Sequence, residues 1–249
     1  MRGWQAAVLG VVQGAAEVFP VSSSAQLALL PWLAGWEPPA DRTRFAAGLH
    51  AGSTAGLALA LRDDLTSLRP AEARRLALSA APAAVAGLLL QDVVERRLGG
   101  PRRTAALMAA SAAALWVADR QGDSGQRDRP AHVTSRDVTA ASLAQVAALA
   151  PGVSRTGVTL TALRARGVDR EQALRTSLLM SIPVTVGAAG LTAVRGRARP
   201  PLVPTALAAG TAYATARRVP SARTVVAASV AYRLVLAAAV AVRRAKERG

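Results

Sequence analysis

Apolar and polar positions alternate along this chain in blocks of helical length. Six apolar segments are separated by short polar stretches rich in arginine. Uninterrupted apolar runs of about 20 residues are typical of membrane-spanning helices, and several of these segments fall short of that length, which indicates longer helices or tight packing. The pattern predicts an all-α, polytopic integral membrane protein with about six spanning helices. The predicted segments are residues 45–61, 76–90, 104–118, 174–194, 202–216 and 224–242.

Two further apolar stretches, residues 4–33 and 138–163, are interrupted by proline, glycine and serine. Irregular backbone at membrane depth is tolerated where protein or a water-filled cavity covers it. Each stretch is therefore predicted to form a re-entrant helix hairpin. The first begins like a signal peptide, but an acid and a proline interrupt it and no clear cleavage site follows, so we expect it to be retained.

Each interrupted stretch precedes three apolar segments, so the chain divides into two similar halves. The halves are approximately residues 1–118 and 135–242, joined by a polar loop at 119–137. An odd number of spans in each half would make the repeats inverted. Interrupted segments at matching positions in two halves indicate a binding site at the interface between repeats. We expect a single membrane domain with one site between the halves.

Composition and charge favour a membrane protein over a nucleic-acid binder. Hydrophobic residues make up 51% of the chain but aromatic residues only 3%, and small apolar residues suit close helix packing in lipid. The net charge is +16, and all but one of the 31 basic residues are arginine. These arginines flank apolar segments, where membrane lipid headgroups would be their partners, and no nucleic-acid-binding motif accompanies them. The absence of cysteine excludes disulfides and thiolate metal sites.

Glu17 is an acid inside the first interrupted stretch. A carboxylate near the middle of a membrane costs about 2.5–3.5 kcal/mol and usually marks a functional site. Gln13 lies one helical turn earlier on the same face, and Ser22, Ser23 and Ser24 follow a proline. The serines are candidate nucleophiles or phosphate donors. Glu17 is a candidate base, or a ligand for a divalent cation, Mg²⁺ or Ca²⁺.

The second interrupted stretch contains a turn rich in hydrogen-bond donors, PGVSRTG at residues 151–157. Arg155 offers a planar guanidinium suited to phosphate, and Ser154, Thr156 and Thr159 add hydroxyls. A loop that leads into a helix N-terminus also favours an anion. The pattern predicts a phosphate-binding turn. The alternative is a helix-capping turn whose arginine reaches the membrane surface. For the first stretch the alternative is that the serines only cap a helix and Glu17 pairs with Arg155.

Two other ionisable residues have two interpretations each. Arg233 interrupts the last apolar segment, where it either pairs with a neighbour or lines the polar pocket. His50 lies in the first apolar segment, where it is either a packed, hydrogen-bonded residue or a proton carrier.

These motifs resemble those of the undecaprenyl-diphosphatase (bacitracin-resistance) family. Residues 13–27 look like its first signature and residues 151–160 look like its second, nearly letter for letter. The resemblance continues through three further parts of the chain, residues 45–61, 178–183 and 231–233. It implies a multi-pass phosphatase of the bacterial plasma membrane that removes the terminal phosphate from undecaprenyl diphosphate, a polyprenyl diphosphate lipid, and so recycles the lipid carrier of cell-wall synthesis. A homodimer is an open alternative to a monomer.

The resemblance also assigns roles. Glu17 matches the second glutamate of the first signature, Ser23 matches the proposed nucleophile, and Arg155 matches the phosphate-binding arginine. Substrate contacts are expected from a wider set of polar side chains: Gln13, Ser22, Ser24, Gln26, Ser154, Thr156 and Thr159.

Three positions depart from the family pattern. Gln13 replaces the first glutamate, Gln26 replaces a histidine, and Ala25 replaces the glycine before it. A lost carboxylate weakens a site for Mg²⁺ or Ca²⁺, and a lost histidine removes a general acid–base group that typically contributes ~10²–10⁴-fold. Two functions therefore stay open, a phosphatase and a degenerate homologue that binds or translocates a polyprenyl phosphate without hydrolysis.

Overall fold

The computed structural model describes residues 1–124, 132–195 and 201–247, which form helices and no strand. The predicted all-α class is confirmed for these residues. In chain order the elements are α1 (Gly3–Val18), α2 (Ser23–Ala34), α3 (Arg42–Ala60), α4 (Arg62–Thr66), α5 (Pro70–Leu78), α6 (Ala81–Leu98), α7 (Pro101–Ser124), α8 (Ser135–Ala144), the 3₁₀ helix η2 (Gln145–Leu149), α9 (Arg155–Ala165), α10 (Arg170–Arg195), α11 (Leu202–Arg217) and α12 (Ala222–Lys246).

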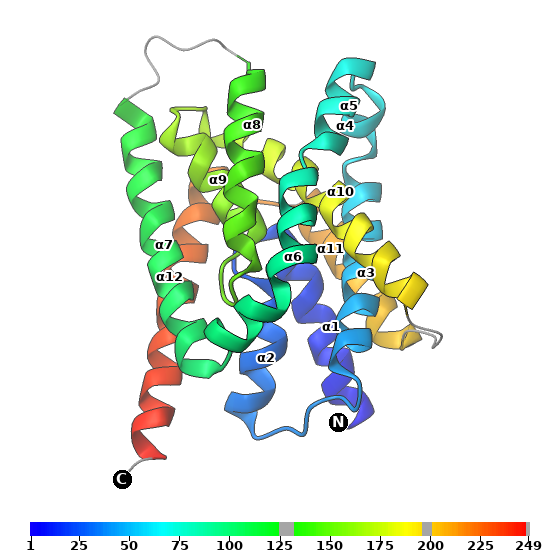
Figure 1. Cartoon of the computed structure of the whole chain (residues 1–249), viewed down its shortest axis with the longest axis vertical. Helices are drawn as coiled ribbons and strands as arrows, with labels where there is room; N and C mark the ends of the chain where they lie inside the picture. The colour runs from blue at the N-terminus through cyan, green and yellow to red at the C-terminus, as the bar shows by residue number, and fades with distance from the viewer. Residues whose placement is uncertain (125–131, 196–200, 248–249) are drawn as a thin grey trace.

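Both interrupted stretches form helix–turn–helix hairpins. The first consists of α1 and α2, and α1 ends just before Phe19, because a residue that precedes proline disfavours helical backbone. The second consists of α8, η2 and α9, with Gly152 at the turn in the left-handed region at φ 89°. In Figure 1 the turns of both hairpins lie near the middle of the molecule, and their open ends lie at opposite ends of it. A pair of oppositely directed re-entrant hairpins requires this arrangement.

The six apolar segments are mostly helical, and most of their helices extend beyond the predicted ends. Helix α7 continues to Ser124 and α8 begins at Ser135, so much of the stretch predicted as a loop at 119–137 is helical. Residues 125–131 of that stretch lie outside the described residues. Segment 76–90 spans the junction of α5 and α6. The extensions follow from the flanking arginines, because arginine is a good helix former although it ends an apolar run.

Among the described residues two stretches are long and apolar enough to cross a membrane, Pro70–Leu98 and Ala222–Lys246. The first of them is largely unburied, and α6 exposes Val85, Leu88 and Leu89. A continuous exposed apolar face of this kind is typical of contact with lipid. The span count of six and the division into inverted repeats stay predictions.

Helix α11 packs against α1 and α3 through glycines. A Cβ atom added to Gly56 of α3 would lie 2.0 Å from the carbonyl oxygen of Ala209, and one added to Gly14 of α1 would lie 2.5 Å from that of Ala208. Gly52 makes an equally close approach to α11. The predicted use of small residues for close packing is confirmed here. This packing holds α1 and α3 side by side, and both carry residues of the site described below.

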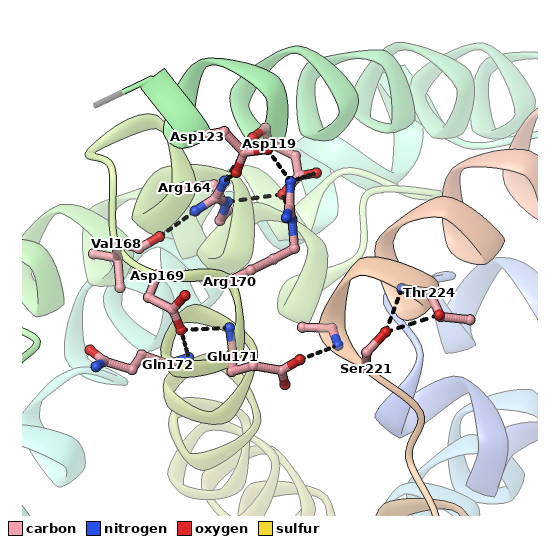
Figure 2. A network of polar contacts seen from close by, with 11 residues as sticks. Asp119, Asp123, Arg164, Val168, Asp169, Arg170, Glu171, Gln172, Ser221 and Thr224 are labelled. Atoms are coloured by element: carbon pink, nitrogen blue, oxygen red, sulfur yellow. Dashed lines mark hydrogen bonds and ion pairs between the residues drawn. The ribbon is translucent and has the colours of Figure 1, made fainter. Parts of the chain in front are cut away.

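A buried ionic network fixes the second hairpin to its neighbours (Figure 2). Arg164 at the end of α9 is fully buried and donates from Nε to Asp119 of α7 at 2.9 Å. Arg170 of α10 donates from Nε to the same carboxylate at 2.7 Å. Burial raises the pKa of Asp123, but hydrogen bonds from Arg170 and Arg164 bring that pKa below its ordinary value. The end of α7 is therefore tied to the turn between α9 and α10.

Candidate functional site

A cluster of polar side chains around Glu17 lies where α1 packs on α3. Gln13 Nε2 donates to Glu17 Oε2 at 3.0 Å, and Ser53 of α3 donates to the same oxygen at 3.1 Å. His50 Nδ1 lies 3.4 Å from Glu17 Oε2 and 3.0 Å from Gln13 Nε2. Glu17 is 5% exposed and the His50 side chain 20%, so the histidine is the more accessible member. The cluster therefore holds one carboxylate in a defined orientation and places an imidazole beside it.

His50 and Ser53 join this site through the packing of α3. Ser53 is absent from the residues predicted from sequence, and the signal available for it is its spacing of one helical turn from His50. His50 was open to two interpretations, and its contact with Glu17 places it at the site. Glu17 contacts His50, and among the described residues it forms no ion pair with Arg155, so the alternative pairing of Glu17 with Arg155 is not observed as a direct contact.

The three serines lie at the turn that leads into α2. Ser22 is buried and has φ 68°, and it is the one non-glycine residue with positive φ among the described residues. Such a conformation costs about 1–3 kcal/mol and is concentrated at functional sites. Ser23 begins α2 and is half-buried, and Ser24 is exposed, with its Oγ 3.3 Å from Ser22 Oγ. The strained turn places Ser23 at a helix N-terminus, where the helix dipole favours an anion.

Gln26 has both ends of its side-chain amide engaged by the protein. Its Nε2 donates to the carbonyl oxygen of Val21 at 3.0 Å, and its Oε1 accepts from the Tyr232 hydroxyl at 2.6 Å. The side chain is fully buried. Gln26 thus connects the first hairpin to α12, and Tyr232 is a second residue that sequence analysis did not assign to the site. The expected contact of Gln26 with substrate stays a prediction.

The second motif forms the N-terminus of α9. Ser154 is its N-cap and accepts from the Gly157 amide at 3.1 Å. The Thr159 hydroxyl donates to the carbonyl oxygens of Arg155 and Thr156, each 3.1 Å away. Among the described residues, the Ser154 hydroxyl hydrogen and the amides of Arg155 and Thr156 at the helix start remain available to a ligand. Local hydrogen bonds therefore use the Ser154 oxygen and the Thr159 hydroxyl hydrogen, and other donors of the predicted phosphate-binding turn remain for a ligand.

Arg155 projects from the first turn of α9 towards α10. Its Nη1 donates to Thr185 Oγ1 at 2.5 Å and to the carbonyl oxygen of Ser181 at 3.5 Å. It is half-buried and lies within electrostatic range of Glu17. The carboxylate of the first hairpin and the guanidinium of the second therefore lie in one region of the molecule. A site at an interface between two halves stays a prediction.

The expected divalent cation finds few protein ligands here. Among the described residues no group of three or more histidine, cysteine, aspartate or glutamate side chains is placed to hold a metal ion. Glu17 and His50 form a pair, and neutral oxygens of Ser53 and Gln13 lie beside them. Mg²⁺ is usually bound through one or two carboxylates plus substrate phosphates. The residues therefore fit a cation that arrives with a phosphorylated substrate.

Comparisons with known proteins identify the family of this chain. The family described as "Bacitracin resistance protein BacA" matches residues 6–245. The chain is 37% identical over 199 residues to the undecaprenyl-diphosphatase of Desulforudis audaxviator, covering 76% of this chain and 75% of that protein. It is 39% identical over 199 residues to that of Geobacter sulfurreducens, covering 74% and 72%. It is 34% identical over 232 residues to that of Trichlorobacter lovleyi, covering 84% of each. The match over almost the whole chain shows that this chain belongs to the BacA bacitracin-resistance protein family.

Proposed function

We propose that this protein is a membrane phosphatase that hydrolyses undecaprenyl diphosphate to undecaprenyl phosphate and phosphate. The observation that carries the proposal is the packing of the two hairpins, in which Val18, next to Glu17, belongs to the same buried apolar cluster as Leu160 of the second motif. Diphosphate hydrolysis needs an anion-binding group and a base at one place, and the two hairpins supply one each. The curated relatives carry the name of this activity.

Arg155 and the N-terminus of α9 would bind the diphosphate. A guanidinium makes bidentate hydrogen bonds to phosphate oxygens, and the first amides of a helix add partial positive charge. Arg155 already donates to neutral groups, Thr185 and the Ser181 carbonyl. Exchange of these neutral acceptors for charged phosphate oxygens strengthens its hydrogen bonds, because charge-assisted bonds are roughly twice as strong as neutral ones.

Ser23 would attack the terminal phosphorus. Its Oγ forms a bond to phosphorus while the bond to the bridging oxygen breaks, so undecaprenyl phosphate leaves with the electron pair. Glu17 accepts the hydroxyl proton, and Gln13, Ser53 and His50 orient its carboxylate. Water then hydrolyses the phosphoserine and releases phosphate. The strained Ser22 turn supports this role for its neighbour, since strain of that kind is concentrated at functional sites.

In the alternative role of Glu17, its carboxylate would hold a Mg²⁺ or Ca²⁺ ion together with diphosphate oxygens instead of accepting the proton. When bound, the ion would neutralise negative charge on the phosphates. Treatment of the purified protein with EDTA should lower phosphate release, and addition of Mg²⁺ or Ca²⁺ should restore it. Full activity in EDTA would remove the cation from the proposal.

The proposed location is the bacterial plasma membrane, with the chain crossing it several times. The apolar lengths of Pro70–Leu98 and Ala222–Lys246 and the exposed apolar face of α6 support it. Extraction should require detergent. The homodimer stays a prediction, and light scattering of the purified protein would measure its oligomeric state.

The test of the activity is phosphate release from undecaprenyl diphosphate by purified protein in detergent. The wild type should release phosphate, and the rate of phosphate release should fall at least about 100-fold in Arg155→Ala. Removal of one hydrogen-bond donor that stabilises transition-state charge has an effect of this scale. Arg74→Ala, which removes an exposed arginine of α5, is the matched control and should keep wild-type activity. Saturable lipid binding without turnover in the wild type would refute hydrolysis and favour a binding or translocating protein.

A further inference from the structure

Arg233 of α12 is a fully buried arginine whose hydrogen-bonding capacity is mostly unused. Its side chain is 0% exposed. One nitrogen, Nη2, donates to the hydroxyl of Ser111 on α7. Within the described part of the chain, Nε and Nη1 have no hydrogen-bond partner, and no carboxylate forms an ion pair with the guanidinium. The guanidinium therefore carries a buried positive charge that the described protein groups do not neutralise.

The unpartnered Nη1 points to the phosphate-binding turn. A Cβ atom placed on Gly157 would lie 3.4 Å from Arg233 Nη1 and 3.3 Å from Ser154 Oγ. Both polar atoms thus border the same position, the third residue of α9. Because Gly157 has no side chain, nothing of its own covers that position. The turn predicted from the sequence consequently has a second guanidinium beside it, contributed by the other end of the chain.

An uncompensated buried charge is strongly unfavourable, so a residue of this kind is retained where something else neutralises it. A phosphate oxygen meets both requirements of Arg233, since it is anionic and accepts several hydrogen bonds. Arginine also stays protonated when buried, so it cannot relieve the cost by losing a proton. The chemistry that fits the unpartnered nitrogens is therefore an anionic phosphoryl group at the N-terminus of α9.

We propose that Arg233 is a second phosphate-binding residue, which donates from Nη1 to a phosphoryl oxygen beside Ser154 and Gly157. The proposal rests on the proposed function for its natural ligand, a lipid diphosphate. Two guanidiniums, Arg155 and Arg233, then share the negative charge of the diphosphate. The alternative for Arg233 is structural, in which it only joins α12 to α7 through Ser111.

The test compares four variants of the full-length protein in detergent, with inorganic pyrophosphate as the probe. Arg233→Met removes the charge, and Arg233→Lys keeps the charge but loses the planar donors. Ser111→Ala removes the structural partner alone. Arg243→Met removes a guanidinium from the same helix, where it stacks on Trp32 away from the motif turn. Pyrophosphate affinity is measured by thermal shift and by competition with undecaprenyl diphosphate, which separates binding of a free anion from binding of the lipid.

Arg233→Met should weaken pyrophosphate binding roughly 10- to 100-fold, the equivalent of one charge-assisted hydrogen-bonded contact. Arg233→Lys should fold and weaken it roughly tenfold. Ser111→Ala and Arg243→Met should each stay within about twofold of wild type. In turnover assays the loss at Arg233 should raise KM at least as much as it lowers kcat, because the contact is made in the ground state.

The proposal would be overturned if Arg233→Lys bound pyrophosphate as tightly as the wild type and only its folding stability fell, as in Ser111→Ala. The outcome is separable from that of the phosphatase assay. If the wild type binds pyrophosphate through Arg233 but releases no phosphate, the inference stands and the hydrolytic function fails. If hydrolysis is normal in every Arg233 variant, the inference fails and the function stands.

Discussion

The contact between Gly56 of α3 and the backbone of α11 is the tightest point at which the packing can be tested. A Cβ atom at position 56 would lie 2.0 Å from the carbonyl oxygen of Ala209. That oxygen belongs to a helical backbone and cannot rotate away. Gly56→Ala therefore requires α3 and α11 to separate by more than 1 Å at this point to restore an ordinary contact of about 3.4 Å.

The loss of stability caused by Gly56→Ala is best measured by comparison with Gly210→Ala, because Gly210 lies next to Ala209 on α11. A Cβ atom at Gly210 meets nothing within 4 Å. Both substitutions gain the helical preference of alanine over glycine, about 1 kcal/mol, so this gain cancels in the comparison. Overpacking of a close contact typically costs about 1–3 kcal/mol. Gly56→Ala should consequently be about 1–3 kcal/mol less stable than Gly210→Ala.

The assay is reversible unfolding in mixed micelles, with phosphate release measured on the same samples. Gly56→Ala should also lower activity, because α3 carries Ser53 and His50, which contact Glu17. A 1 Å displacement can cost about 10²-fold in rate even when the change lies away from the chemistry. If the two alanine variants unfold at the same denaturant concentration, close α3–α11 packing does not support the site, and the reasoning is refuted.

Three further predictions concern other contacts. Tyr232→Phe leaves the buried Gln26 Oε1 without its donor and should cost about 1–3 kcal/mol in unfolding free energy, and an unchanged value would show that water or another donor replaces the hydroxyl. Asp119→Asn weakens the ion pair with buried Arg164 and should lower the free energy of unfolding by about 3–5 kcal/mol in the same assay. A loss below about 1 kcal/mol would show that other acidic residues neutralise Arg164. Glu17→Gln should lower kcat by about 10²–10⁴-fold while thermal unfolding in detergent still shows a folded protein, and retained kcat would exclude Glu17 as the base.

Local sequence patterns were sufficient for the helical class and for the two interrupted hairpins. Prolines at positions 20 and 151 interrupt apolar runs, and both hairpins turn there. Helix ends were less predictable, because flanking arginines end an apolar pattern without ending a helix, as α7 demonstrates by continuing to Ser124. The signatures at residues 13–27 and 151–160 also pointed to the family that the whole-chain comparison confirms.

The partners of each site residue were beyond the reach of sequence patterns. Glu17 contacts His50 and Ser53, and Gln26 contacts Tyr232 more than 200 positions away. These contacts depend on how helices pack, and the packing depends on glycines such as Gly56 that carry no chemical signal of their own.

The sequence by itself determined that this chain is helical, apolar enough for a membrane, and equipped with two polar turns. Those properties depend on short-range preferences, namely apolar periodicity, the stiffness of proline and the capping chemistry of serine. Only the tertiary structure decided which charges meet: His50 rather than Arg155 contacts Glu17, and Arg233 lies beside the α9 turn. The physical reason is that electrostatic and hydrogen-bonding partners are selected by spatial distance, which the close packing of α1, α3, α7, α9, α11 and α12 sets.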